Sequence, residues 1–256
     1  MKISIVTACY NSEATIRDTL RTIQMQTHQD IEHIVIDGGS TDGTLEILEK
    51  NRAHIAYLTS EPDNGLYDAM NKGVSKATGD VIGLLNSDDM LANEHVLSNV
   101  VNALANPEVD ACYGDLVYVN QDNINQVARY WRSSPYNPAL LAKGWIPAHP
   151  TFYARREVHD NYGMLFNLDY KLAADYELLL RLLFSHQIKV SYIPEVMIKM
   201  RLGGTTNKSL KNIFNQNKEI MRALKSHNYH YSPVKMAYSK LLDRIQQYRK
   251  RDEYVQ

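Results

Sequence analysis

Short apolar segments rich in β-branched residues alternate with segments of helical periodicity over the first 85 residues. The apolar segments are residues 3–8, 31–36, 55–58 and 81–85, and the helical ones are residues 14–26, 44–51 and 71–77. Strands that alternate with helices form parallel βαβ units. The sequence therefore predicts an α/β fold whose first part is a Rossmann-like half sheet.

The pattern changes after residue 94. Residues 96–104 have helical spacing, and residues 111–120 form a predicted strand with which residues 127–131 can pair. Four prolines between residues 135 and 150 mark a looped region. A strong helical pattern follows at residues 169–184, then a strand pattern at 189–193 and two basic amphipathic helices at 208–225 and 233–251.

Cysteine content and hydropathy restrict the compartment in which the chain works. Its two cysteines, Cys9 and Cys112, lack metal-ligand spacing and fit a reducing cytosol better than a disulfide scaffold. No apolar segment approaches the roughly 20 residues that span a bilayer. The strand-like N-terminus is too short for a signal peptide. We therefore expect a cytoplasmic protein.

Charge is distributed unevenly, although the formal net charge is only −1. Residues 208–256 contain 11 Lys/Arg and 4 Asp/Glu, a net charge of +7, which leaves −8 on the rest of the chain. A basic segment on an acidic body suggests an anionic partner for that segment. Its amphipathic helices and tyrosines suit an anionic membrane surface. Packing on the rest of the chain or on a second subunit is an equal alternative.

The predicted strand at residues 81–85 ends in the polar segment Asn86-Ser87-Asp88-Asp89. A strand end of an open α/β sheet lies at the crevice where ligands bind. Adjacent carboxylates repel each other there unless a cation lies between them and a ligand, and Mg²⁺ prefers one or two carboxylates plus substrate phosphates. The segment therefore predicts a metal site. Capping of a helix that starts near Leu91 is the alternative.

The other predicted strand ends also carry residues suited to a nucleotide. Backbone groups at Thr7 and Ala8 can hold a base or ribose on which Tyr10 stacks. Asp37 can accept hydrogen bonds from a ribose, and the polar loop at residues 63–73 leads into a helix where Lys72 can offset phosphate charge. Taken singly, ordinary turns and helix caps are the alternative for each segment.

Two common phosphate-binding motifs are missing from the sequence. No G-x-G-x-x-G follows the first predicted strand, which argues against nicotinamide or flavin binding, and no Walker A loop occurs. Acids that end the second and fourth strands without those glycines indicate a metal-bridged nucleoside diphosphate.

Four motifs follow each other in a specific order. They are T-x-x-Y-N at residues 7–11, I-D-G-G-S-T-D-G-T at 36–44, D-N-G-x-Y-D-A-x-N-K-G at 63–73 and L-N-S-D-D at 85–89. With these motifs, residues 1–205 resemble the inverting family-two glycosyltransferases of the GT-A fold. The resemblance implies a Rossmann-like nucleotide-binding half sheet merged with a mixed-sheet acceptor half. It leaves residues 206–256 as a basic C-terminal helical extension.

The resemblance implies that the aligned residues bind a nucleotide-sugar donor and a divalent metal, Mn²⁺ or Mg²⁺. The family's acid-x-acid motif corresponds to Asn86 and Asp88, so its first acid is replaced and Asp88 is the one expected metal ligand. Residues 199–206 resemble the family's closing loop. The expected donor-binding residues are Thr7, Ala8, Tyr10, Asp37, Asn64, Gly65, Lys72, Asn86, Ser87 and Arg201.

The resemblance also implies a catalytic base just before a leucine-rich helix. The family carries an acid–acid pair there, and this chain has Ala174-Asp175, so Asp175 inherits the role. A positioned carboxylate is needed because the acceptor hydroxyl must lose its proton as it attacks C1. Glu177 is the competitor, and helix capping is the alternative for Asp175. Trp145 and His149 are expected on the acceptor side of the site.

The expected function is therefore inverting transfer of a sugar from a nucleotide-sugar, foremost a UDP-sugar, to a saccharide or lipid-linked saccharide in polysaccharide synthesis. A non-catalytic nucleotide-sugar-binding subunit is one alternative, because acids are replaced at Asn86 and Ala174. A nucleotidyltransferase is another, although its glycine- and arginine-rich phosphate loop is absent. We expect no nucleic-acid partner. An oligomer and peripheral attachment to the inner face of the cytoplasmic membrane are both compatible with the sequence.

Overall fold

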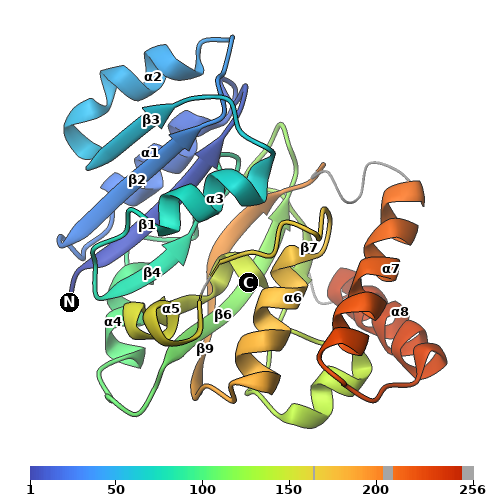
Figure 1. Cartoon of the computed structure of the whole chain (residues 1–256). Helices are drawn as coiled ribbons and strands as arrows, with labels where there is room; N and C mark the ends of the chain where they lie inside the picture. The colour runs from blue at the N-terminus through green and yellow to red at the C-terminus, as the bar shows by residue number, and fades with distance from the viewer. Residues whose placement is uncertain (164, 204–209, 250–256) are drawn as a thin grey trace.

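The computed structural model describes residues 1–163, 165–203 and 210–249 (Figure 1). Its centre is a nine-stranded sheet in the order β3-β2-β1-β4-β8-β6-β9-β5, with β7 paired to β6. The strands are β1 (Ile3–Cys9), β2 (Ile31–Asp37), β3 (Tyr57–Ser60), β4 (Val81–Leu84), β5 (Met90–Leu91), β6 (Ala111–Val119), β7 (Val127–Trp131), β8 (Tyr153–Arg155) and β9 (Val190–Arg201).

The first half of the sheet is parallel. β1 lies between β2 and β4, and Ile3 pairs with Ile31 on one side and with Val81 on the other. β3 extends the same parallel arrangement beyond β2. The predicted Rossmann-like half sheet is therefore confirmed, and its strands end on one edge.

The second half of the sheet is mixed and is built around β6. β7 and β8 run antiparallel to β6, whereas β9 runs parallel to it. The pairing predicted for residues 111–120 and 127–131 is confirmed. β9 continues past Ile193, where the sequence pattern ended, to Arg201. Pro194 lacks a backbone donor and coincides with a register shift between β6 and β9, so the strand passes it without a regular ladder.

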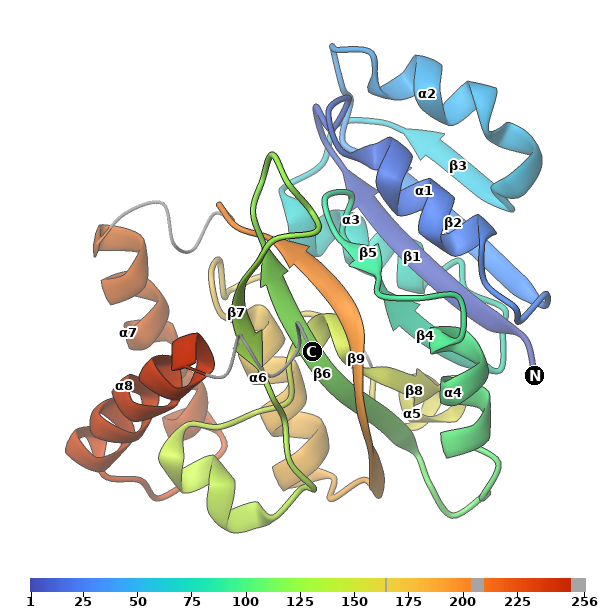
Figure 2. The ribbon, with the colours of Figure 1, turned by 180° about the vertical axis from the view of Figure 1, so that it is seen from behind.

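Helices cover both faces of the sheet, as Figures 1 and 2 show from opposite sides. Apolar side chains of α1, α2 and α4 pack on one face, and those of α3, α5 and α6 pack on the other. The helices are α1 (Ile16–Gln24), α2 (Thr44–Lys50), α3 (Leu66–Val74), α4 (Val96–Ala103), α5 (Arg156–Tyr162), α6 (Ala174–Leu180), α7 (Leu210–Ser226) and α8 (Pro233–Arg249), with short helical turns η1 (Arg52–His54), η2 (Pro138–Lys143), η3 (His149–Thr151) and η4 (Arg181–Ser185).

The two C-terminal helices differ in how they pack. Ile220, Ala223 and Leu224 of α7 are buried in the same apolar cluster as the leucines of α6, whereas Met236 is the buried side chain of α8 within the described range. The predicted extension at residues 206–256 thus shares a core with the preceding segment, and the predicted boundary at 205 lies outside the described residues. Residues 208, 209, 250 and 251 of the predicted helices lie outside the described residues. None of the helices described here is long and apolar enough to cross a membrane.

Two helices, α3 and α6, begin five residues away from the predicted start. α3 begins at Leu66 rather than residue 71, directly after Gly65. The φ of Gly65 is 108°, a value that residues other than glycine rarely adopt. α6 begins at Ala174 rather than residue 169, because the backbone N–H groups of residues 171–173 donate to the Glu219 carboxylate instead of starting a helix.

Candidate active site

A cavity of about 660 Å³ opens where β4 ends, between the parallel half of the sheet and the elements β7, η2, α6 and α8. It collects eight of the residues predicted from sequence, while six others do not line it. The lining residues among them are Ala8, Asn86, Ser87, Asp88, Trp145, His149, Asp175 and Arg201. The remaining six are Thr7, Tyr10, Asp37, Asn64, Gly65 and Lys72.

Asp175 lies in the first turn of α6 and has two side-chain partners. Its Oδ2 is 3.1 Å from His149 Nδ1, and its Oδ1 accepts a hydrogen bond from the Tyr67 hydroxyl at 3.3 Å. Burial alone raises the pKa of Asp175, but the hydrogen bond and charge of His149 outweigh it and hold that pKa below its usual value. The side chain remains 19 % exposed. An ionised carboxylate is therefore fixed in two contacts while it still faces the cavity.

Glu177, the competing acid of the sequence prediction, faces away from the cavity. Its Oε1 accepts a hydrogen bond from Arg181 Nε at 3.2 Å and lies 3.0 Å from His227 Nε2. The side chain is only 5 % exposed and does not line the cavity. The geometry gives Glu177 a structural role, in which it ties α6 to the end of α7.

The turn after β4 is held by several hydrogen bonds. Arg201 donates from Nη1 to the Asp88 carbonyl at 2.8 Å and forms an ion pair with Asp18. Thr19 Oγ1 donates to the Asp89 carbonyl at 2.7 Å. β5 follows immediately and α4 begins only at Val96, so the helix-cap alternative for this segment is wrong. Arg201 positions the turn, and its predicted contact with a diphosphate stays a prediction.

The donor set of this turn fits a hard divalent cation. Asp88 faces the cavity, and Asn86 Oδ1 is buried without a hydrogen-bond partner among the described residues, while its amide nitrogen donates to Asp89 Oδ2 at 2.8 Å. Burial and the neighbouring Asp88 raise the pKa of Asp89 well above its usual value. No group of three or more His, Cys, Asp or Glu side chains in the described ranges could hold a metal by itself. Asp88 and Asn86 could hold one together with substrate phosphates.

Asp37 and Thr7 lie inside the protein rather than at the cavity. The Asp37 carboxylate is fully buried and accepts hydrogen bonds from the backbone N–H groups of Gly39 at 3.1 Å and Ser40 at 2.9 Å and from the Ser60 hydroxyl at 2.6 Å. Thr7 Oγ1 is also buried, 3.0 Å from His33 Nε2. In the structure Asp37 shapes the loop after β2, so its expected direct contact with a ribose stays a prediction.

The residues predicted around α3 and after β1 lie on the surface. Lys72 Nζ is 2.8 Å from Glu61 and 3.6 Å from Asp68, so its charge is matched within the protein. Asn64 belongs to the turn that precedes α3, and Tyr10 is 62 % exposed. Their predicted contacts with a donor stay predictions.

Aromatic side chains form the cavity wall near η2. The Trp145 ring lies 6.1 Å from that of Tyr113 in an edge-on arrangement and 6.5 Å from that of Tyr136 in a stacked one. This packing fixes the indole beside the cavity, where its apolar face can contact a sugar ring.

The sequence prediction missed three residues of this site. Tyr67 lies within the motif at residues 63–73, but its contact with Asp175 depends on the packing of α3 against α6. Arg129 on β7 and Lys240 on α8 line the cavity from elements far apart in sequence. A basic residue on an amphipathic segment carries no signal that distinguishes a cavity from solvent.

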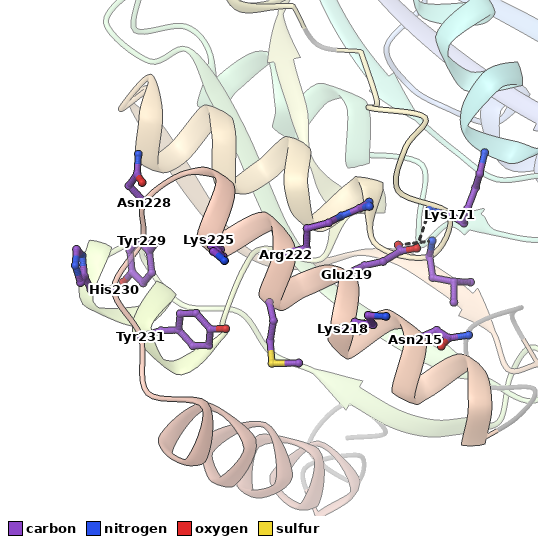
Figure 3. A pocket seen from close by; sticks show the side chains of 12 residues that line it. Lys171, Asn215, Lys218, Glu219, Arg222, Lys225, Asn228, Tyr229, His230 and Tyr231 are labelled. Carbon is purple, nitrogen blue, oxygen red and sulfur yellow. Dashed lines mark hydrogen bonds between the residues drawn. The ribbon is translucent and has the colours of Figure 1, made fainter.

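A larger hollow of about 1010 Å³ lies along α7 and carries none of the predicted site residues (Figure 3). Glu219 extends from α7 to the segment before α6, and the exposed cations Lys218, Arg222 and Lys225 follow the same helix. Since this hollow lacks the acidic strand end and Asp175, the smaller cavity is the candidate active site.

The chain is similar to known proteins both in sequence and in fold. The family model described as "Glycosyl transferase family 2" matches residues 4–163. A PGL/p-HBAD biosynthesis glycosyltransferase of Mycobacterium bovis is 31% identical over 209 residues, which cover 80% of this chain and 78% of that one.

Two solved structures share the fold at low sequence identity. S. aureus TarS 1–349 in complex with UDP-GlcNAc has a TM-score of 0.67 at 18% identity, covering 93% of this chain and 69% of that one. The mannosyltransferase PcManGT from Pyrobaculum calidifontis, in complex with GDP-Man and Mn²⁺, has a TM-score of 0.66 at 17% identity, covering 93% and 68%. The mixed sheet with its covering helices therefore has the GT-A architecture that the sequence predicted.

Proposed function

Since this chain belongs to glycosyltransferase family 2, we propose that it moves a sugar from a UDP-sugar to a saccharide or lipid-linked saccharide acceptor, with inversion and with a divalent metal. The observation that carries the proposal is the presence of Asp175, His149 and Asp88 around one cavity. The relative named as a PGL/p-HBAD biosynthesis glycosyltransferase supports a transferase of a biosynthetic pathway, and the solved complexes with UDP-GlcNAc and GDP-Man support a nucleotide-sugar donor.

In the proposed reaction Asp175 acts as the general base. An acceptor hydroxyl gives its proton to the Asp175 carboxylate while its oxygen bonds to C1 of the donor sugar, and the bond from C1 to the diphosphate oxygen breaks on the opposite face. His149 and Tyr67 hold the carboxylate in place during this step. Attack opposite the leaving group inverts the anomeric centre.

Asp88 and Asn86 would hold the cation, which neutralises charge on the leaving nucleoside diphosphate when it is bound. Arg201 keeps this turn in position through the Asp88 carbonyl. We expect Asp88→Ala to abolish metal-dependent transfer without unfolding the chain, because Asp88 lies at a turn that Arg201 and Thr19 also hold. Circular dichroism checks the fold, and full activity of the variant would contradict the metal role.

Release of UDP from a panel of UDP-sugars, measured with Mn²⁺, with Mg²⁺ and with excess chelator, tests the function. We expect turnover of at least one UDP-sugar that stops in chelator. Binding of a UDP-sugar without turnover, with or without an acceptor, would favour the non-catalytic subunit instead. Turnover of GDP-sugars alone would still support a transferase, but it would show that the donor is a GDP-sugar.

We also propose that α8 brings the enzyme to a membrane that carries its acceptor. Val234, Tyr238, Leu241 and Ile245 are exposed on this helix, in a segment that also carries basic side chains. A lipid-linked acceptor would then meet the cavity, which α8 lines from its other side.

A further inference from the structure

The candidate cavity is strongly basic on the side formed by β7, η2 and α8. The basic residues that line this side are Arg129, Arg132, Lys143, Lys240 and Arg244, against one acid, Asp243.

Arg129 is the most buried of these cations. The residue is 7 % exposed, and its guanidinium lies 3.6 Å from the centroid of the Tyr118 ring. Its Nε has no hydrogen-bond partner among the described residues. A buried cationic donor without a hydrogen-bond partner destabilises the folded protein unless a ligand supplies the acceptor.

Lys240 and Lys143 complete the group from two other elements. Lys240 Nζ lies 5.9 Å from the centroid of the Tyr176 ring and donates to Asn217 Oδ1 at 3.4 Å. Tyr176 directly follows Asp175 in the chain. Burial lowers the pKa of Lys240 to about 8. Neither lysine forms an ion pair with a carboxylate of the described residues, although Lys143 is close enough to Asp243 to lower the pKa of that acid. Lys143 and Lys240 therefore carry positive charge that is not paired with a carboxylate of the described residues.

We propose that Arg129, Lys143 and Lys240 form a subsite for a phosphate or diphosphate group of the acceptor, which makes that acceptor a phosphate-bearing saccharide. The inference rests on the proposed transferase function. Lys240 lies over the ring of Tyr176, the residue after Asp175. A phosphate bound to Lys240 would therefore place the attached sugar toward the proposed base. Three cations from separate elements line one cavity, an arrangement suited to phosphate.

The hollow along α7 is the competing anion site. Lys218, Arg222 and Lys225 lie there, but all three are exposed, and solvent screens such charges. Lys218 is therefore a matched control for Lys240, because both are lysines on C-terminal helices and only Lys240 lines the catalytic cavity.

Calorimetric titration of the full chain, saturated with UDP and Mn²⁺, with geranyl phosphate tests the subsite. Geraniol serves as the uncharged match. We expect geranyl phosphate to bind and geraniol not to bind. Lys240→Gln and Lys143→Gln should each weaken binding by about tenfold, as expected for loss of one charged hydrogen bond. Lys240→Arg should restore most of the affinity, and Lys218→Gln should match the unmodified chain.

Three results would overturn the inference. Affinity that falls in Lys218→Gln but not in Lys240→Gln or Lys143→Gln would place the phosphate in the hollow along α7. Competition between UDP and geranyl phosphate would assign the cations to the donor. Equal binding of geraniol would show that the lipid, not the phosphate, is recognised. UDP release by the unmodified chain separates this inference from the proposed function. Turnover of a UDP-sugar without binding of geranyl phosphate would reject the subsite alone, whereas no turnover of any UDP-sugar would reject the proposed function.

Discussion

At the scale of single residues, the structure distinguishes two acids that sequence spacing alone left in competition. Asp175 faces the cavity and Glu177 is bound by Arg181 and His227. We expect Asp175→Asn to lower kcat by at least about 10²-fold, since the amide cannot accept the proton. Donor binding, measured by titration with UDP, should persist.

Glu177→Gln is the matched control for that variant. It should lower the melting temperature, because it removes a buried carboxylate from Arg181 and His227, yet retain most of the kcat of the remaining folded protein. A large loss of kcat in Glu177→Gln with an active Asp175→Asn would show that the base is misassigned.

His149 should control the pH dependence of the reaction. Burial raises the pKa of Asp175 and His149 lowers it below its usual value, so in the native chain Asp175 stays ionised well into the acid range. Removing the imidazole in His149→Ala leaves burial as the main influence, and the pKa of Asp175 should rise. We therefore expect the acid limb of the kcat–pH profile to move to higher pH. An unchanged acid limb would show that His149 serves the acceptor alone.

The sequence indicated Asp88 because it follows a predicted strand end, and Asp175 because the resemblance to the family-two glycosyltransferases implies a base before a leucine-rich helix. It could not show that Tyr67 and His149 share the Asp175 carboxylate, since that contact joins α3, η3 and α6. The complete burial of Asp37 is likewise a product of the loop after β2, whose backbone donors satisfy it. Pairings of this kind depend on tertiary packing.

At the scale of elements, α7 fixes the segment that leads into α6, the helix that carries the proposed base. Glu219 reaches from α7 toward Lys171 (Figure 3). Its carboxylate accepts hydrogen bonds from the backbone N–H groups of Lys171 at 3.0 Å, Leu172 at 2.8 Å and Ala173 at 2.9 Å. Asp175 follows two residues later. The position of the proposed base therefore depends on α7, a helix outside the region that the family model matches.

Glu219→Ala should disturb both stability and catalysis. The three backbone donors lose their acceptor, and each unsatisfied donor costs about 1–3 kcal/mol before water enters. We expect a lower melting temperature and a lower kcat, with donor KM unchanged, because Asp175 loses its support. Glu46→Ala, which removes an exposed acid paired with Lys50, should leave both nearly unchanged. Identical behaviour of the two variants would contradict the role of Glu219.

Regular elements were predictable where the apolar period extended over several residues. The parallel strands β1 to β4 and the pairing of β6 with β7 agree with the sequence pattern. β5 and β8 contain only two and three residues, too few for a period to be visible, and tertiary pairing creates them. Glu219, which is far from α6 in the sequence, binds the backbone just before that helix, so no local sequence rule could predict that α6 begins at Ala174.

At the scale of the whole molecule, basic charge and exposed apolar surface coincide on the C-terminal helices. Residues 208–256 carry +7 and the rest of the chain −8. The apolar side of α7 is buried against α6, which matches the packing alternative, whereas that of α8 is exposed. The residues Val234, Tyr238, Leu241, Ile245 and Tyr248 recur at intervals of four and three along α8, which places them on one stripe, and they are 41–79 % exposed.

This stripe should bind anionic membranes. A basic helix with an exposed apolar stripe lies in the interface of such membranes, where tyrosines are also favoured. We expect the full chain to co-sediment with vesicles of 30% phosphatidylglycerol in phosphatidylcholine, but not with pure phosphatidylcholine, and salt should weaken the binding. The double variant Leu241→Ser, Ile245→Ser should stay in the supernatant, while Phe214→Ser on α7 serves as the control for loss of one exposed apolar side chain.

Point variants are the sharper test, because deleting residues 206–256 would also remove Glu219 from the catalytic helix. The cations of α8 that line the cavity remain in the double variant, so its UDP release should equal that of the unmodified chain. Equal recovery in the supernatant with both kinds of vesicle would reject membrane binding. A dimer of the unmodified chain that the double variant abolishes would then assign the stripe to a second copy.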